Sequence, residues 1–152
     1  MNHLTRPALI IQLLLGSLLL TSCSSPSPFE SLSAGGCSDT QQVAVEKHIT
    51  GQINALSSQD WPKAYAYAAQ SFQNSIKLEQ FTDIIAAQYQ MLIDNQGFTF
   101  KNCKITSSGV SEEVEVIDPR GDYLLLYRLE VEQLQLGIVA ASVIEASEGL
   151  KT

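Results

Sequence analysis

The chain is poor in basic residues and in histidine. Its 152 residues include 9 Lys and Arg against 16 Asp and Glu, with only 2 His. Proteins that follow nucleic-acid phosphates need clustered Lys and Arg, so the formal net charge of -7 argues against nucleic acid as a partner. Metal centres with recognisable spacing need several His or Cys ligands, and the sequence holds no such cluster. We therefore expect no metal and no cofactor.

Glycine-rich loops and long apolar runs are also missing. Gly97, Gly109, Gly121 and Gly137 stand singly, which gives no phosphate-binding loop. The apolar stretch Pro7 to Leu20 is shorter than the roughly 20 residues that a membrane-spanning helix needs, so a permanent transmembrane anchor is the weaker interpretation. The chain length excludes a large multidomain enzyme and allows one ordinary domain with a short extra segment.

The amino terminus is typical of a secretion signal, because a mildly positive start precedes the apolar stretch. The segment Leu20-Thr21-Ser22-Cys23 follows it and resembles the bacterial lipobox. This resemblance implies that residues 1–22 are a lipoprotein signal peptide and that Cys23 is lipidated. The mature protein would then be attached to the cell membrane through its lipid anchor, on the extracytoplasmic side. Two or three acyl chains make such an attachment effectively permanent.

The rest of the chain divides by composition. After the lipidated Cys23, residues 23–36 are rich in Ser, Pro and Gly and are predicted to form a tether that buries no core. Residues 37–148 carry the periodic apolar pattern of a single α+β domain. Residues 149–152 are expected to be a tail.

Helical spacing dominates the first half of the domain. Apolar residues recur three and four apart in Gln41 to Leu56, which predicts one long amphipathic helix. Asp60 is expected to cap a short second helix with Trp61 in its first turn. After a break around Gln70 to Asn74, the segment Leu78 to Leu92 is predicted to form a third helix.

From Phe98 onward the apolar pattern alternates, which predicts strands. Four strands are expected, over Phe98 to Ile105, Val110 to Ile117, Tyr123 to Val131 and Gly137 to Glu145, with a hairpin turn at Asp118 to Asp122. Three helices followed by an antiparallel meander of four strands make an α+β plan. The polar face of this sheet is expected to be acidic and solvated, with Glu112, Glu113, Glu115, Glu130 and Glu132 on it.

The order of elements resembles the nuclear-transport-factor-like superfamily, also called cystatin-like or SnoaL-like, in which a curved sheet wraps helices into a cone. The residues that carry this resemblance are Ile53 to Leu56, Asp60 to Tyr65, and Phe81. Within the superfamily, Ala64 to Ala68, Asp118 to Gly121 and Leu126 to Arg128 are similar to the bacterial family called domain of unknown function 4864. That resemblance implies the fold but brings no assigned reaction and no catalytic residue.

Cys37 and Cys103 are the two cysteines that remain once Cys23 is acylated. Because extracytoplasmic compartments are often oxidising, the pair favours a disulfide. The alternative is two free buried thiols, since spacing alone does not establish contact.

Candidate functional residues are few. His48, Trp61, Tyr65, Phe81 and Tyr89 are candidates for lining an apolar pocket, although aromatic residues at helical spacing also suit plain core. The small residues Ala140, Ala141 and Ser142 leave room for something bulky above them. His48 is the one candidate for a general base, but it lies at the margin of the apolar helix stripe.

Three function classes fit these features. The leading hypothesis is a non-catalytic binding or interaction module of the cell envelope, whose partner is an unknown envelope protein. The second is a carrier that holds a small apolar ligand in the cone cavity. The third is a small hydrolase or isomerase with His48 as general base, and it requires further titratable groups close to this histidine.

Overall fold

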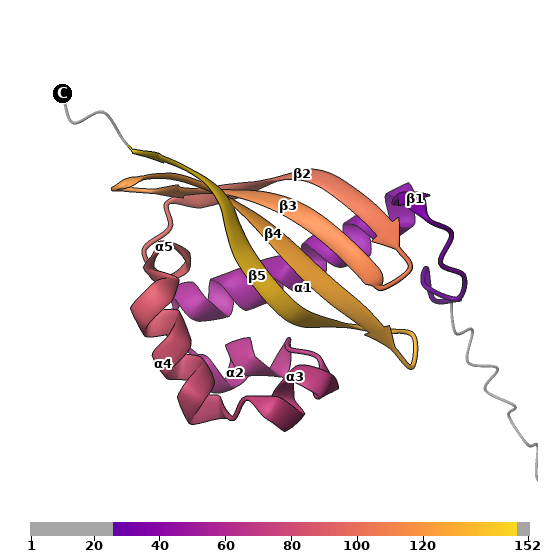
Figure 1. The fold of residues 1–152 in the computed structure, drawn as a ribbon, viewed down its shortest axis with the longest axis horizontal. Helices are drawn as coiled ribbons and strands as arrows, with labels where there is room; N and C mark the ends of the chain where they lie inside the picture. The colour runs from indigo at the N-terminus through magenta and orange to yellow at the C-terminus, as the bar shows by residue number, and fades with distance from the viewer. Residues whose placement is uncertain (1–25, 149–152) are drawn as a thin grey trace, which may run out of the picture.

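The computed structural model describes residues 26–148, so the predicted signal peptide 1–22, the predicted lipidation site Cys23 and the tail 149–152 lie outside the described residues. One antiparallel sheet curves over a layer of helices that all lie on the same side of it (Figure 1). The chain therefore has the mixed α+β plan that the sequence predicts.

The sheet is a meander in which each strand pairs with the next one along the chain. Its order is β1-β2-β3-β4-β5, and every pairing is antiparallel. The strands are β1 (Gly35–Gly36), β2 (Gly97–Thr106), β3 (Gly109–Asp118), β4 (Gly121–Glu132) and β5 (Gln135–Glu148). The helices are α1 (Asp39–Ser57), α2 (Trp61–Ala66), α3 (Gln70–Ser75), α4 (Leu78–Gln88) and α5 (Gln90–Ile93).

The core lies between α1 and the inner face of the sheet. Val45, Ile49, Ile53 and Leu56 repeat at helical spacing along α1 and are fully buried. They pack against inward residues of the central strands, which are Val114, Val116, Leu125, Tyr127 and Leu129. Apolar residues alternate along β3 and β4 and recur about every 3.6 residues along α1, so each element has one apolar face. These faces pack against each other.

Helix α1 begins at a capping box. The Ser38 hydroxyl accepts a hydrogen bond from the backbone N–H of Gln41, and the Gln41 side chain accepts one from the backbone N–H of Ser38. This arrangement satisfies two helix-end donors at once. The preceding residue, Cys37, is bonded to Cys103 of β2 with their Cα atoms 5.4 Å apart, which confirms the predicted disulfide.

The number of elements differs from the sequence prediction of three helices and four strands. The break expected around Gln70 to Asn74 is instead helix α3, although this segment is largely polar and has no buried residue. The predicted third helix is interrupted at Tyr89, whose φ of -125° ends α4 before α5 begins. The extra strand β1 consists of two glycines, which carry no alternation that could reveal a strand.

The segment before β1 is more ordered than a free tether. Phe29 belongs to the core and is only 5% exposed. The Gln41 side chain donates a hydrogen bond to the Pro28 carbonyl at 3.0 Å, and the Ser27 hydroxyl donates to the Leu134 carbonyl at 3.2 Å. The aromatic ring within a Ser- and Pro-rich stretch is therefore what attaches that stretch to the domain.

No helix within residues 26–148 has both the length and the apolar character needed to cross a bilayer.

Candidate functional site

An apolar groove opens between the helices and the last strand. It has a volume of about 300 Å³ and is partly open to solvent. Phe81, Ile84 and Ile85 of α4 form one wall, and residues 138–142 of β5 form the other. Pockets that hold small ligands span roughly 300–1,000 Å³, so this groove suits a small molecule.

Small residues on β5 create the space. Ala140, Ala141 and Ser142 all line the groove, as their size at the sequence level suggested. Tyr89 sets the distance between the helical wall and β5, because its hydroxyl donates a hydrogen bond to the Ala141 carbonyl at 2.6 Å. Phe72 closes another side and meets Phe81 edge-on, with the ring centroids 6.2 Å apart. The groove is thus a built feature whose width a tyrosine sets.

The groove lining contains no Asp, Glu, His, Lys, Arg or Cys side chain. Its polar side chains are Gln52, Tyr89 and Ser142. Gln52 is buried and donates to the Ala64 carbonyl at 3.4 Å, while Tyr89 already donates its hydroxyl proton to β5. Acid–base chemistry requires a titratable group within hydrogen-bond reach of the reacting atom, and this lining offers apolar contact with a few neutral polar groups instead.

Of the five residues predicted for a pocket, the structure brings Phe81 and Tyr89 to the groove. Tyr65 lies behind Phe81, with ring centroids 5.5 Å apart, and donates its hydroxyl proton to the Ile76 carbonyl at 2.7 Å. Trp61 is partly buried against the core. Neither residue lines the groove: Tyr65 packs behind Phe81 and Trp61 packs against the core. The sequence could not distinguish these positions because all four aromatic residues share helical spacing.

His48 lies outside the groove lining and joins α1 to the start of β5. Its Nε2–H donates a hydrogen bond to the Tyr67 carbonyl at 2.9 Å, and its ring meets the Tyr67 ring edge-on. The same carbonyl accepts the backbone N–H of Ile138. Burial lowers the pKa of His48, although its hydrogen bond to Tyr67 works in the opposite direction. The geometry therefore gives His48 a structural role, in which its neutral imidazole links α1 to the Tyr67 carbonyl and through it to β5.

Glu112 corrects the prediction of a solvated acidic face. It points inward from β3 between Val110 and Val114 and is 0% exposed. Neither carboxyl oxygen has a hydrogen-bond partner of acceptable geometry. The backbone at Asn102 and Lys101 is nevertheless near enough to lower the pKa of the carboxyl group, against the effects that raise it. Burial above all, and then the Glu46 carboxylate, raise the pKa of Glu112 to about 7.

The signal for this inward position was present in the sequence. Glu112 stands two residues from Val110 and from Val114, so strict alternation puts all three side chains on one face of β3. Its neighbour on β4 is Tyr127, which is fully buried and whose hydroxyl is also unpartnered. Burial raises the pKa of this phenol.

A second hollow, of about 670 Å³, lies between α3 and the β4–β5 hairpin and is mainly polar. Two hydrogen bonds connect α3 to β4 beside it. The backbone N–H of Gln70 donates to the Glu132 carboxylate, and the Ser71 hydroxyl donates to Glu130 at 2.7 Å. These two hydrogen bonds join α3 to β4 beside the hollow.

Side chains suited to metal binding do not gather within the described range 26–148, where no group of three or more His, Cys, Asp or Glu is close enough to hold an ion.

Comparison with known protein families identifies the family of the chain. A family model described as Domain of unknown function (DUF4864) matches residues 38–149, which is more than half of the chain and covers every helix and the four long strands. No curated protein and no solved structure matches the chain.

Proposed function

Because the chain belongs to the DUF4864 family, whose description assigns no activity, we propose from the groove itself that the protein is a non-catalytic binding module that holds a small apolar ligand. The observation that carries this proposal is the apolar lining between α4 and β5, which has a few neutral polar groups and no titratable acid or base of neutral range. Such a lining favours binding by burial of apolar surface.

The ligand class follows from the size and chemistry of the groove. A volume of about 300 Å³ suits a compact molecule. A charged ligand would lose hydration there without meeting an opposite charge, which is unfavourable. We therefore propose an uncharged, largely apolar ligand, with Gln52 and Ser142 available to orient one polar group.

The location we propose is the outside face of a cell membrane, with Cys23 lipidated. The lipobox-like segment in residues 20–23 and the apolar stretch before it support this proposal. The helix layer inside a curved antiparallel sheet also agrees with our interpretation of a nuclear-transport-factor-like cone. A partner protein of the envelope would then meet the module at its outer surface, with the groove left for the ligand.

Catalysis by His48 is the candidate function that the site supports least. This histidine donates its Nε2–H to a backbone carbonyl and is not part of the groove lining. A reaction in the groove would therefore need its proton transfers from groups that the lining does not supply.

Binding of a neutral apolar fluorophore, N-phenyl-1-naphthylamine, tests the proposal. Ala141 lies on the inner side of β5, opposite α4, so Ala141→Phe should fill the groove. We expect its affinity for the probe to fall by about tenfold or more, which corresponds to about 1.4 kcal/mol of lost binding. Fluorescence titration measures this change.

The matched control is Ala146→Phe, which adds the same ring to the same strand at an exposed position outside the groove. It should leave probe affinity unchanged. Equal affinity of the wild type and Ala141→Phe, with both proteins folded by circular dichroism, would show that the groove is not the binding site.

A further inference from the structure

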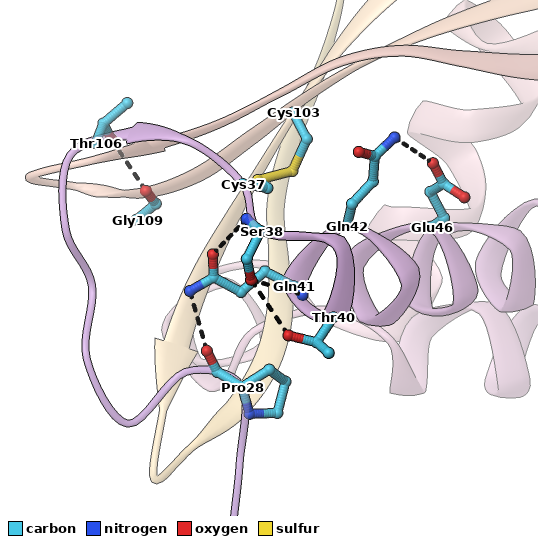
Figure 2. The surroundings of a disulfide bond; sticks show 10 residues. All are labelled: Pro28, Cys37, Ser38, Thr40, Gln41, Gln42, Glu46, Cys103, Thr106 and Gly109. Atoms are coloured by element: carbon cyan, nitrogen blue, oxygen red, sulfur yellow. Dashed lines mark hydrogen bonds between the residues drawn. A yellow bond between two sulfur atoms is a disulfide. The ribbon is translucent and has the colours of Figure 1, made fainter.

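The chain enters the domain at one end of the molecule and is fixed there. Phe29 is buried in the core, and Gln41 near the start of α1 donates a hydrogen bond to the Pro28 carbonyl (Figure 2). Ser27 donates to the carbonyl of Leu134 in the turn between β4 and β5. The start of α1 and the β4–β5 turn lie at the same end of the molecule, opposite α4 and α5 (Figure 1).

The distance between this end and Cys23 is short. Five residues, 24–28, separate Cys23 from Phe29. A fully extended chain advances at most about 3.6 Å per residue, so the six steps from Cys23 to Phe29 span about 22 Å or less. If Cys23 carries acyl chains, the end of the domain at which Phe29 is buried lies next to the bilayer surface.

Exposed apolar side chains are present at this same end. We call them the entry surface and define it as Leu32, Val43 and Leu134, which are 42%, 64% and 49% exposed. Leu32 lies in the segment that follows Phe29, Val43 lies in the second turn of α1, and Leu134 lies in the β4–β5 turn. Exposed apolar residues are ordinary, and three others, Ile117, Val143 and Ile144, lie on β3 and β5 away from this end. Exposure alone therefore does not mark the entry surface.

Leu134 supplies an independent observation. It adopts a φ of +65° and its neighbour Gln133 a φ of +50°, between the paired residues Glu132 and Gln135. Two-residue turns of this kind favour Asn and Gly, because other residues are strained at positive φ. A large apolar residue is therefore kept in water at a position where Gly would fit the backbone better, and such outliers are concentrated at functional positions.

We propose that the entry surface rests on a lipid bilayer, with Leu134 and Leu32 inserted at the level of the lipid headgroups. Apolar insertion rather than charge attraction drives the contact, since Leu32, Val43 and Leu134 carry no charge. The exposed charges at this end have both signs, with Glu30 and Asp39 acidic and Lys104, which pairs with β1, basic. Side chains inserted to this depth add to the attachment that an acyl anchor provides. The orientation keeps α4, one wall of the groove, at the end away from the bilayer (Figure 1).

This inference rests on the proposed anchor at Cys23, so the experiment supplies the anchor chemically. The mature chain from Cys23 is coupled through that thiol to a maleimide lipid in phosphatidylcholine vesicles, because Cys37 and Cys103 are bonded to each other. Trp61 is the one tryptophan, and Trp61→Phe gives a background in which Leu134→Trp reports depth. Brominated lipid chains quench a tryptophan that enters the bilayer.

We expect bromination to lower the emission of Leu134→Trp by about twofold, as for a side chain at headgroup depth. The matched control is Ile144→Trp, which replaces a residue of similar exposure near the far end of β5. Its emission should not change. Equal quenching at positions 134 and 144, or none at either, would overturn the proposal.

Two further measurements separate the alternatives. Emission of Leu134→Trp that shifts to the blue with protein concentration in the absence of vesicles would mean that the entry surface pairs two copies, which also overturns the proposal. Probe binding in the groove is measured on the same variants and should be unchanged, so loss of the orientation and loss of the ligand-binding function are distinguished. The mass of the mature protein purified from cells reports separately whether Cys23 is acylated.

Discussion

Glu112 is an ionisable residue in a fully buried environment. Its carboxyl group lies in the core, with Tyr127 beside it on β4 and Glu46 facing it from α1. Its pKa of about 7 exceeds the ordinary value of 4.5, so between these pH values the folded protein holds a proton that the unfolded chain releases. The free energy of unfolding should therefore fall as pH rises from about 4.5 to about 7 and stay low above that.

The size of this loss is on the order of 3 kcal/mol, because each unit of pKa shift corresponds to about 1.4 kcal/mol. Glu112→Gln cannot ionise and should remove most of this pH dependence. Urea unfolding at pH 5, 6, 7 and 8 measures it. Glu113→Gln is the matched control, since Glu113 is the next residue along β3 and points to the outer face. A pH dependence that is the same in both variants would exclude Glu112 as its source.

Leu134 gives a second prediction for a single residue. Because its φ is +65°, Leu134→Gly should relieve strain and raise the free energy of unfolding by about 1 kcal/mol. The same change should weaken attachment of the anchored protein to vesicles, since the apolar side chain is lost. Urea unfolding and vesicle flotation measure the two effects. Leu32→Gly serves as the control, because it removes an exposed apolar side chain at a residue without positive φ and should gain no stability.

At the scale of elements, the junction of α3 with β5 depends on a close backbone approach. The backbone N–H of Ala69 donates to the Ile138 carbonyl, and Gly137 packs directly against Ala69. A Cβ atom on Gly137 would lie 2.4 Å from the Cα atom of Ala69, so the two segments would have to move apart. Gly137→Ala should lower the free energy of unfolding by about 1–3 kcal/mol, the usual effect of overpacking.

Thermal unfolding followed by circular dichroism measures this effect. Gly36→Ala in β1 is the matched control, because its Cβ atom would meet nothing within 4 Å. The control should leave the midpoint nearly unchanged. A similar loss of stability in both variants would indicate a general cost of replacing glycine rather than the contact with Ala69.

The elements also show what a sequence pattern can reveal. Helix α1 and strands β3 and β4 have strong periodicity and were predicted near their observed bounds. The break at Tyr89 depends on its hydroxyl reaching Ala141, a contact 52 residues away that no local pattern encodes. Strand β1 depends on the Cys37–Cys103 bond next to it. Its two glycines have no side chains, so they show no alternation of apolar and polar residues.

The groove was predictable only in part, because it too depends on contacts between residues far apart in the sequence. The small residues Ala140, Ala141 and Ser142 indicated space above β5, and Phe81 and Tyr89 were named as its candidate lining. Whether an aromatic residue lines the space or supports its wall depends on how α2, α3 and α4 pack, which tertiary contacts decide. The burial of Phe29 is not predictable from the sequence, because a single aromatic residue within a Ser- and Pro-rich stretch is typical of a linker.

At the scale of the whole molecule, the Cys37–Cys103 bond ties the entry of the chain to the sheet. It joins residues 66 positions apart and holds β1 against β2, next to the capped start of α1 (Figure 2). Closing a loop of this length removes entropy from the unfolded chain, worth about 4 kcal/mol in the loop-entropy description. The double variant Cys37→Ala, Cys103→Ala should lose about this much free energy of unfolding.

Reduction of the wild type should have the same effect as the double variant, since both open the same loop, and urea unfolding with and without dithiothreitol compares them. The double variant itself should not respond to dithiothreitol, which controls for other effects of the reductant. Loss of this bond also frees the residues on both sides of β1, so Phe29 should leave the core more readily and quenching at Leu134→Trp in anchored protein should decrease. Unchanged stability after complete reduction would show that the capping box and the burial of Phe29 hold this end of the domain without the bond.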